Sequence, residues 1–227
     1  MNRIIVAIDG FSACGKSTMS KQLAQYAGYV YVDTGAMYRA VGLFCIENGL
    51  IDSTFINEKL LSEKISDIKI HFENINGVQH TFLNGKDVEN QIRTLEAGNA
   101  ASRVSAIGFV RTALVDMQQK MGEKKGIVMD GRDIGTVVFP DAELKIFVTA
   151  LPEIRAKRRY EELLHNSKNA DYQQVLENIN ERDYRDTHRT ESPLLRAADA
   201  MFLDNSHLSQ SQQFEIVKQW FEEKVNS

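Results

Sequence analysis

Cysteine and proline are scarce in this sequence of 227 residues, which contains two cysteines and three prolines. Cys14 and Cys45 cannot form a disulfide framework, and no group of cysteines and histidines has the spacing of a zinc site. Because 43% of the residues are hydrophobic and 26% are charged, a wholly disordered, collagen-like or low-complexity chain is excluded. The sequence indicates a globular protein that suits a reducing compartment.

Long hydrophobic runs and an excess of one charge are also missing. The first apolar run, residues 4–8, is broken by Asp9 and is too short for a signal peptide, and no run approaches the ~20 residues of a membrane helix. The 27 basic and 31 acidic residues give a formal charge of −4, which argues against broad binding to DNA or RNA. We therefore expect a soluble, unexported, cytoplasmic protein with no membrane or nucleic acid partner, and a monomer.

Short apolar runs alternate with amphipathic segments along most of the chain. The continuous run at residues 4–8 is typical of a strand buried on both faces of a sheet. Further strands are expected at residues 30–33, 126–130, 144–149 and 200–204. Helices are expected at residues 16–27, 36–47, 53–64 with Ser53 as N-cap, 95–121 with a break near Gly108, 152–164, 172–181, and over the last segment, which carries Phe214, Val217, Phe221 and Val225. This alternation predicts an α/β fold built on a parallel sheet.

The pattern changes between about residues 50 and 93. Residues 68–72 alternate between apolar and polar, and two Asn-Gly pairs, Asn76-Gly77 and Asn84-Gly85, separate short strand-like runs. Asn-Gly between alternating runs is a strong hairpin signal. We therefore predict a three-stranded antiparallel meander that is an insertion and not part of the main sheet.

A complete phosphate-loop motif, GxxxxGK[ST], follows the first predicted strand and precedes a predicted helix. Backbone N–H groups of such a loop and the helix N-terminus enclose a polyphosphate such as that of ATP. Lys16 would span the β- and γ-phosphates and Ser17 would bind Mg²⁺. Cys14 is expected to be a small packed residue, with a reactive thiol as the alternative. The ATP-binding residues are Gly10, Phe11, Ser12, Ala13, Cys14, Gly15, Lys16, Ser17 and Thr18.

Two polar clusters follow later strands, at residues 33–39 and 130–133. In open α/β sheets ligands bind beyond the carboxyl ends of the strands, so we expect these clusters to converge near the phosphate loop. Asp130, at a strand end, is the candidate for holding Mg²⁺ through water, and a turn cap is its alternative role.

Motifs along the whole chain resemble those of the bacterial cytidylate kinases, within the nucleoside monophosphate kinase family of P-loop proteins. Five motifs occur in the same order as in that family. They are the phosphate loop, DTGAMYR at 33–39, NAASRVS at 99–105, DGRDIGTVVFPDA at 130–142 and ERDYRDTHR at 181–189. The resemblance implies a single domain over residues 1–227 with a three-layer P-loop kinase fold, a five-stranded parallel sheet, a monophosphate-binding insertion at about 50–93 and a mobile helical lid at about 155–190. It implies transfer of the γ-phosphoryl group of ATP to CMP or dCMP with Mg²⁺, in pyrimidine nucleotide metabolism.

The resemblance also implies roles for individual residues. Thr34, where many relatives have Ser, would lie along the monophosphate with Tyr38 and Arg39. Ser102, Arg111 and Asp133 would read cytosine, and Arg132 would bind the acceptor phosphate. Arg182, Asp186 and Arg189 would close over the ribose and phosphates, and Arg158 would be a lid arginine aimed at the transferring phosphoryl group. The catalytic set would be Lys16, Arg132, Arg158 and Arg182.

The chemistry of the substrates agrees with this reading. Cytosine presents an amino donor beside two acceptors, which a carboxylate and a guanidinium such as Asp133 and Arg111 complement, whereas uracil reverses part of this pattern. A phosphate acceptor is already ionised near neutral pH, so positioning and charge neutralisation suffice for transfer.

Two alternatives remain open at the level of sequence. The first is a P-loop kinase for a hydroxyl acceptor, with Asp133 or Asp33 as a base, which has less need for many phosphate-binding arginines. The second is a nucleotide-dependent switch, which needs a water-positioning group and an NKxD-like guanine reader, and the sequence contains neither motif.

Overall fold

The computed structural model describes residues 2–52, 54–165 and 170–226 of the chain. These residues form two compact units. The first unit contains the described residues up to Val32 and from Gly122 onward, and the second contains the described residues from Asp33 to Met121. Among the helices described, none combines the length and the apolar character needed to cross a membrane.

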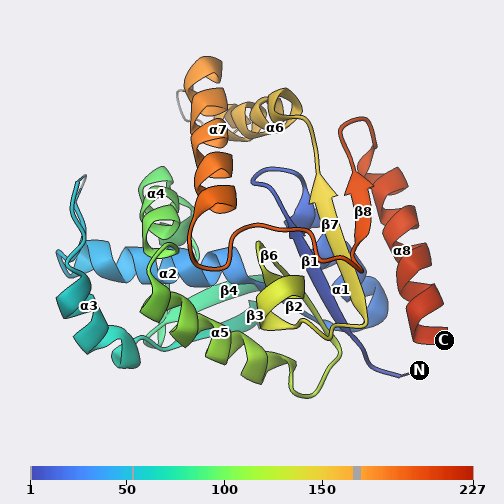
Figure 1. Ribbon diagram of the computed structural model, residues 1–227, viewed down its shortest axis with the longest axis horizontal. Helices are drawn as coiled ribbons and strands as arrows, with labels where there is room; N and C mark the ends of the chain where they lie inside the picture. Colours follow the sequence, from blue (N-terminus) through green and yellow to red (C-terminus); the bar gives the residue numbers. More distant parts are fainter. Residues whose placement is uncertain (1, 53, 166–169, 227) are drawn as a thin grey trace. The chain divides into compact units, whose positions relative to one another are not determined.

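A five-stranded parallel sheet forms the centre of the first unit (Figure 1). Its strands lie in the order β2 (Val30–Asp33), β6 (Ile127–Gly131), β1 (Ile5–Gly10), β7 (Leu144–Thr149) and β8 (Met201–Asp204). Ile5 pairs with Ile127 of β6, and Val6 pairs with Leu144 of β7. β1 lies between two neighbours and its side chains are buried on both faces, which explains the apolar run that it carries up to Ile8. The predicted α/β fold with a five-stranded parallel sheet is confirmed.

Two helices cover one face of this sheet. These are α1 (Lys16–Ala27) and α8 (Gln210–Asn226), which contact each other. Their apolar residues, among them Leu23 of α1 and Phe221 of α8, belong to one core cluster with residues of β1, β6, β7 and β8. The helix predicted at 16–27 therefore has its expected bounds, and the apolar stripe of the last helix faces the core.

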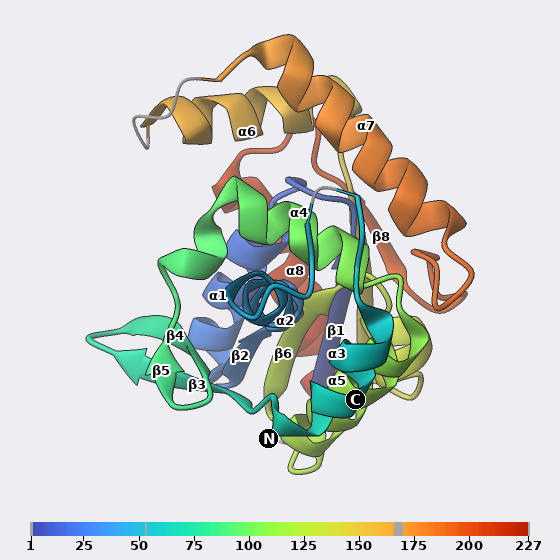
Figure 2. The ribbon, with the colours of Figure 1, turned by 90° about the vertical axis from the view of Figure 1, so that its left-hand side faces the viewer.

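Two further helices of the first unit, α6 (Pro152–His165) and α7 (Tyr172–His188), lie side by side (Figure 2). Arg155 of α6 and Asp183 of α7 form a two-pronged ion pair, with N–O distances of 3.0 and 2.5 Å. α7 continues seven residues beyond the predicted end at Glu181. Its last two turns are polar, so periodicity alone gave no reason to extend it, whereas tertiary contacts of Asp183 and Asp186 stabilise them.

The second unit contains α2 (Thr34–Glu47), α3 (Glu58–Lys64), α4 (Leu95–Val104) and α5, which is assigned as Gly108–Gly122. Two short 3₁₀ turns, Ile65–Asp67 and Gln91–Arg93, follow α3 and precede α4. The break expected near Gly108 separates α4 from α5. The expected cap Ser53 lies outside the described residues, and α3 is capped instead by Asn57, whose side chain accepts from the Leu60 N–H at 3.1 Å.

An antiparallel sheet of three strands, β3 (Ile70–Ile75), β4 (Val78–Leu83) and β5 (Lys86–Asp87), also belongs to the second unit. Asn76 and Gly77 have φ values of 52° and 84°, and the Asn84-Gly85 turn has nearly the same values. Two successive positive φ angles are the geometry of a tight hairpin turn that Asn-Gly favours. The predicted meander is therefore confirmed.

Candidate active site

The phosphate loop connects β1 to α1, and its backbone requires glycine at the first motif position. Gly10 has a φ of 149°, and a Cβ there would lie 2.0 Å from the Val148 carbonyl oxygen. Lys16 is buried at the start of α1, where its Nζ donates to the Phe11 carbonyl at 2.6 Å. Burial lowers the pKa of Lys16, against the opposing effect of nearby Cys14. The loop therefore holds a desolvated cation, which an anionic ligand would stabilise.

Cys14 is a buried free thiol, as expected of a small packed residue.

Ser17 and Asp130, the two residues predicted to hold Mg²⁺, contact each other. Ser17 Oγ donates to Asp130 Oδ2 at 2.8 Å, and the Tyr31 hydroxyl donates to Asp130 Oδ1 at 2.8 Å. A hydroxyl and a carboxylate are hard oxygen donors of the kind that Mg²⁺ prefers, and phosphates and water commonly complete its shell. These two residues therefore fit a Mg²⁺ ion that is held largely by a nucleotide.

Asp9 is a buried carboxylate that the sequence reasoning missed. It stands at the end of β1, and its oxygens accept from the backbone N–H groups of Ile134 and Gly135, at 2.8 and 2.7 Å. Burial raises the pKa of Asp9 to about 7, although the two N–H groups oppose this shift. The signal that could have found it is an acidic residue at the end of an otherwise apolar strand.

The turn after β6 is tied by two ion pairs to Asp186 of α7 and to Arg189, the residue directly after α7. Arg132 Nε donates to Asp186 Oδ2 at 2.7 Å, and Arg189 Nη2 lies 3.8 Å from Asp133 Oδ1. Burial would raise the pKa of Asp186, but Arg132, Arg182 and Arg189 hold it below its usual value. The structure thus brings together five residues predicted to contact the acceptor, and concentrates guanidinium groups there.

The predicted lid arginine Arg158 lies on α6, where both ends of its guanidinium contact Asn205. One turn earlier, Arg155 donates to the Ser12 carbonyl of the phosphate loop at 3.3 Å and its guanidinium lies over the Phe11 ring at 5.1 Å. The sequence analysis gave Arg155 no individual role. Its contacts make it instead a buried link between α6, α7 and the loop.

Asp33 organises the start of α2 in the second unit. Its Oδ1 accepts from the Ala36 N–H at 2.9 Å, and its Oδ2 accepts from Arg39 at 2.8 Å and Arg93 at 3.0 Å. Burial alone would raise the pKa of Asp33, but the two guanidinium groups lower it to about 2. Arg39 was predicted from the sequence, whereas Arg93 was not, because it follows the hairpin and belongs to no motif.

The other predicted acceptor contacts of the second unit lie on α2, α4 and α5. Arg111 is buried, donates to the Ser105 carbonyl at 3.0 Å and lies over the Tyr38 ring at 5.5 Å. The Ser102 hydroxyl is buried without a hydrogen-bond partner among the described residues, and Thr34 is buried at the first position of α2. A buried hydroxyl that lacks a partner is costly to keep, which suits a group that binds a ligand.

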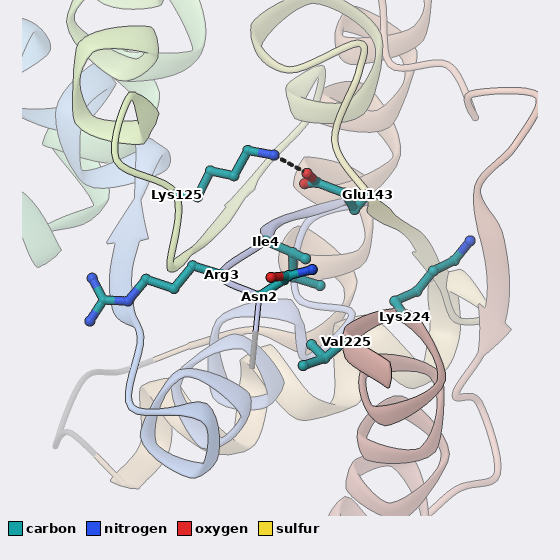
Figure 3. A pocket seen from close by; sticks show the side chains of 7 residues that line it. All are labelled: Asn2, Arg3, Ile4, Lys125, Glu143, Lys224 and Val225. Carbon is teal, nitrogen blue, oxygen red and sulfur yellow. Dashed lines mark hydrogen bonds and ion pairs between the residues drawn. The ribbon is translucent and has the colours of Figure 1, made fainter. Parts of the chain in front are cut away.

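A cavity of about 570 Å³ lies elsewhere in the first unit, lined by Asn2, Arg3, Ile4, Lys125, Glu143, Lys224 and Val225. Figure 3 shows Lys125 and Glu143 pointing toward each other across it, and they form an ion pair. Ile4, Lys125 and Glu143 precede β1, β6 and β7, so the cavity lies at the amino ends of the strands. Ligands of open α/β sheets bind at the carboxyl ends, where the phosphate loop is.

Comparison with known proteins agrees with this geometry. The cytidylate kinase family model matches residues 6–223. The cytidylate kinase of Bacteroides thetaiotaomicron is 55% identical over 226 residues, which cover 99% of this chain and 97% of the relative. The cytidylate kinase of Parabacteroides distasonis is 55% identical over 229 residues, which cover 100% of this chain and 98% of the relative.

A solved structure of an uncharacterized protein from Eubacterium ventriosum is similar in fold. Its TM-score is 0.51 at 12% identity, and the match covers 97% of this chain and 99% of that chain. The match of the family model over most of the chain, and the identity to these relatives over nearly their full length, show that the chain belongs to the cytidylate kinase family.

Proposed function

We propose that this protein transfers the γ-phosphoryl group of ATP to CMP or dCMP and releases ADP with CDP or dCDP. The observation that carries the proposal is the contact of Ser17 with Asp130 beside a complete phosphate loop, in a chain that belongs to the cytidylate kinase family. A strand-end carboxylate beside the serine after the loop lysine is the arrangement by which P-loop NTPases hold Mg²⁺ for phosphoryl transfer.

The donor half of the reaction belongs to residues 10–18. Backbone N–H groups of this loop would bind the phosphates of ATP, and Lys16 would neutralise the β- and γ-phosphates. Mg²⁺, when bound by Ser17 and through water by Asp130, supplies further neutralisation of the phosphate oxygens. Burial of Lys16 strengthens its attraction for phosphate, because the charge is poorly solvated.

The acceptor half uses guanidinium groups and hydrogen-bonding side chains. In the first unit Arg132, Arg182 and Arg189 would bind the acceptor phosphate and ribose with Asp186, and Asp133 would accept from the cytosine amino group. In the second unit Thr34, Tyr38 and Arg39 would bind the monophosphate, and Ser102 and Arg111 would read the base. Arg158, with Lys16, Arg132 and Arg182, would stabilise the charge of the transferring phosphoryl group.

A hydroxyl-acceptor kinase is less well supported, because it needs a carboxylate that takes a proton. Asp33 accepts from two arginines and its pKa is about 2, so it is a poor base near neutral pH. Asp133, the other candidate base, is already engaged in an ion pair with the Arg189 guanidinium. A monophosphate needs no such base, because its oxygen is already ionised.

The test measures ADP formation from ATP and Mg²⁺ with CMP, dCMP, UMP, AMP, GMP or no acceptor, each repeated with Lys16→Ala. We expect fast turnover with CMP and dCMP that Lys16→Ala abolishes. Slow turnover that is indifferent to the acceptor would contradict the proposal and favour a hydroxyl-acceptor kinase or a switch. We also propose that the protein acts in the cytoplasm, a reducing compartment that its two free cysteines suit. We further propose that it is a monomer, which light scattering of the purified protein tests.

A further inference from the structure

Asn205 is a buried residue directly after β8, and its side-chain amide is used at both ends. Nδ2 donates to the carbonyl oxygen of Cys14 in the phosphate loop and to Oε1 of Gln213 in α8, each at 2.5 Å. Oδ1 accepts from Arg158 Nη1 at 3.0 Å, and the Asn205 carbonyl accepts from Arg158 Nη2 at 2.9 Å. One residue therefore joins the loop, the last helix and the arginine of α6.

The chemistry of the partners determines how this amide is oriented. A guanidinium can only donate hydrogen bonds and a backbone carbonyl can only accept them. If the amide were turned over, Nδ2 would face the donors of Arg158 and Oδ1 would face the Cys14 carbonyl. A side chain at this position must therefore offer a donor and an acceptor together, as the planar amide of asparagine does.

The Cys14 carbonyl is important because it shares a peptide group with the N–H of Gly15. In a planar trans peptide the C=O and the N–H point in opposite directions. By holding the Cys14 oxygen, Asn205 directs the Gly15 N–H away from itself. This N–H belongs to the loop that the motif assigns to phosphate binding. A Cβ at Gly15 would lie 3.2 Å from Asn205 Nδ2, so glycine leaves the amide the room that it needs.

We propose that Asn205 is a positioning residue for ATP, which sets the direction of the Gly15 N–H and holds Arg158 beside the phosphate loop. The inference rests on the proposed kinase function and adds to it a residue outside the phosphate-loop motif. Asn205 itself need not touch the nucleotide. Its contribution is expected on the donor side of the reaction, because all of its side-chain partners belong to the loop, to α6 or to α8.

Two substitutions test this proposal. Asn205→Asp keeps the shape but has no donor for the Cys14 carbonyl, and Asn205→Ala removes the donor and the acceptor. We expect the Kd of MgATP, measured by titration calorimetry without CMP, to rise about tenfold or more in both variants, as is typical when a buried hydrogen-bond partner is lost. The KM for CMP should stay within about twofold, because a residue that acts through the donor site changes one substrate constant and not both.

A separate measurement tests whether Asn205 acts through Arg158. If Asn205 acts partly through Arg158, the loss of kcat in Asn205→Ala/Arg158→Ala should be smaller than the product of the two single losses. Losses that simply multiply would overturn this part of the proposal, since they would mean that the two residues act independently.

Asn48→Ala is the control away from the phosphate loop, because the exposed Asn48 side chain also donates to a backbone carbonyl, that of Phe44 at 2.9 Å, at the end of α2. We expect it to lower the thermal unfolding temperature and to leave the Kd of MgATP unchanged. Asn205 variants that behave like this control, or that raise both substrate constants equally, would overturn the proposal. Should Asn205→Ala not fold, Asn205→Asp decides, since it preserves the side-chain volume.

The same titration separates this inference from the proposed function. Wild-type protein that binds MgATP and phosphorylates no CMP would contradict the proposed function. The Kd of MgATP in the Asn205 variants would still decide whether Asn205 positions the loop.

Discussion

The Asp9 carboxylate accepts a hydrogen bond from the backbone N–H of Ile134 at 2.8 Å, and its second oxygen accepts from the next N–H, that of Gly135, at 2.7 Å. Asp9 stands one residue before the phosphate loop motif begins, and Ile134 begins the turn Ile134–Val138, directly after Arg132 and Asp133. A buried carboxylate therefore joins the strand that leads into the loop to the segment that carries two predicted acceptor contacts.

Asp9→Asn should weaken the acceptor site more than the donor site. An asparagine at this position can accept from one of the two N–H groups, but its NH₂ would oppose the other, so the turn after Asp133 must shift. We expect the KM for CMP to rise about tenfold, the typical consequence of one unpaired buried donor. Steady-state kinetics with each substrate varied in turn measure this. An unchanged KM for CMP would mean that the turn holds its position without Asp9.

The stability of the protein should also depend on pH through Asp9. Its pKa rises from 3.8 in the unfolded chain to about 7 in the folded protein, so between these values the folded state binds more protons. Wild-type stability, measured relative to Asp9→Asn, should therefore fall as the pH rises toward 7, by up to about 1.4 kcal/mol per pH unit, and level off above it. Urea unfolding of both proteins from pH 5 to pH 8 tests this, and parallel profiles would contradict it.

Asp33 should have the opposite dependence. Its folded pKa of about 2 lies below the 3.8 of the unfolded chain, so its contribution is complete above pH 4 and is lost as the pH falls toward 2. Asp33→Asn can still cap α2, but it leaves Arg39 and Arg93 without their shared carboxylate. We expect a loss of about 2 kcal/mol in the free energy of unfolding at pH 7, which is what the shift of this pKa from 3.8 to about 2 represents. The control Asp67→Asn, at an exposed carboxylate of the same unit, should change it by less than about 0.5 kcal/mol.

Ser17→Ala should raise the Mg²⁺ requirement. The substitution removes one of the two oxygen donors that the structure places together, and leaves Asp130 bonded to Tyr31. We expect the Mg²⁺ concentration for half-maximal activity to rise about tenfold, and chelation of Mg²⁺ to abolish activity of the wild type. Titration of activity with MgCl₂ at saturating nucleotide measures this. Ser62→Ala, at an exposed helix hydroxyl of the second unit, is the control, and equal Mg²⁺ dependence in all three proteins would rule out Ser17 as a ligand.

Asp133→Ala should lower discrimination between bases. If Asp133 accepts from the cytosine amino group, its loss affects CMP, whereas UMP has a carbonyl at that position and loses little. We expect the ratio of kcat/KM for CMP to that for UMP to fall about tenfold or more. Asp141→Ala, in the same sequence motif but exposed, should leave the ratio unchanged. An equal loss with both nucleotides would assign Asp133 to holding Arg189 and not to base reading.

The elements that sequence reasoning predicted best are those with strong local signals. The helix at 16–27 and the strand at 30–33 have their predicted bounds, and both Asn-Gly turns form the predicted meander. Ser17 was predicted to bind Mg²⁺ from the motif, and Asp130 to hold it through water from its place at a strand end, and the structure shows that their side chains contact each other. The end of α7 was wrong, because its last turns have no apolar periodicity and depend on the ion pairs of Asp183 and Asp186.

The sequence by itself determined the α/β class, the phosphate loop and the family, because each depends on residues close together in the chain or on motifs in a definite order. The tertiary structure alone revealed the partners of Asp9, Arg155 and Asn205. Each of these residues bonds to groups far away in the sequence, 125 residues for Asp9 and Ile134 and 191 for Asn205 and Cys14. Hydrogen bonds and ion pairs act over a few ångströms in space, so no local pattern reports them until the sheet has brought those segments together.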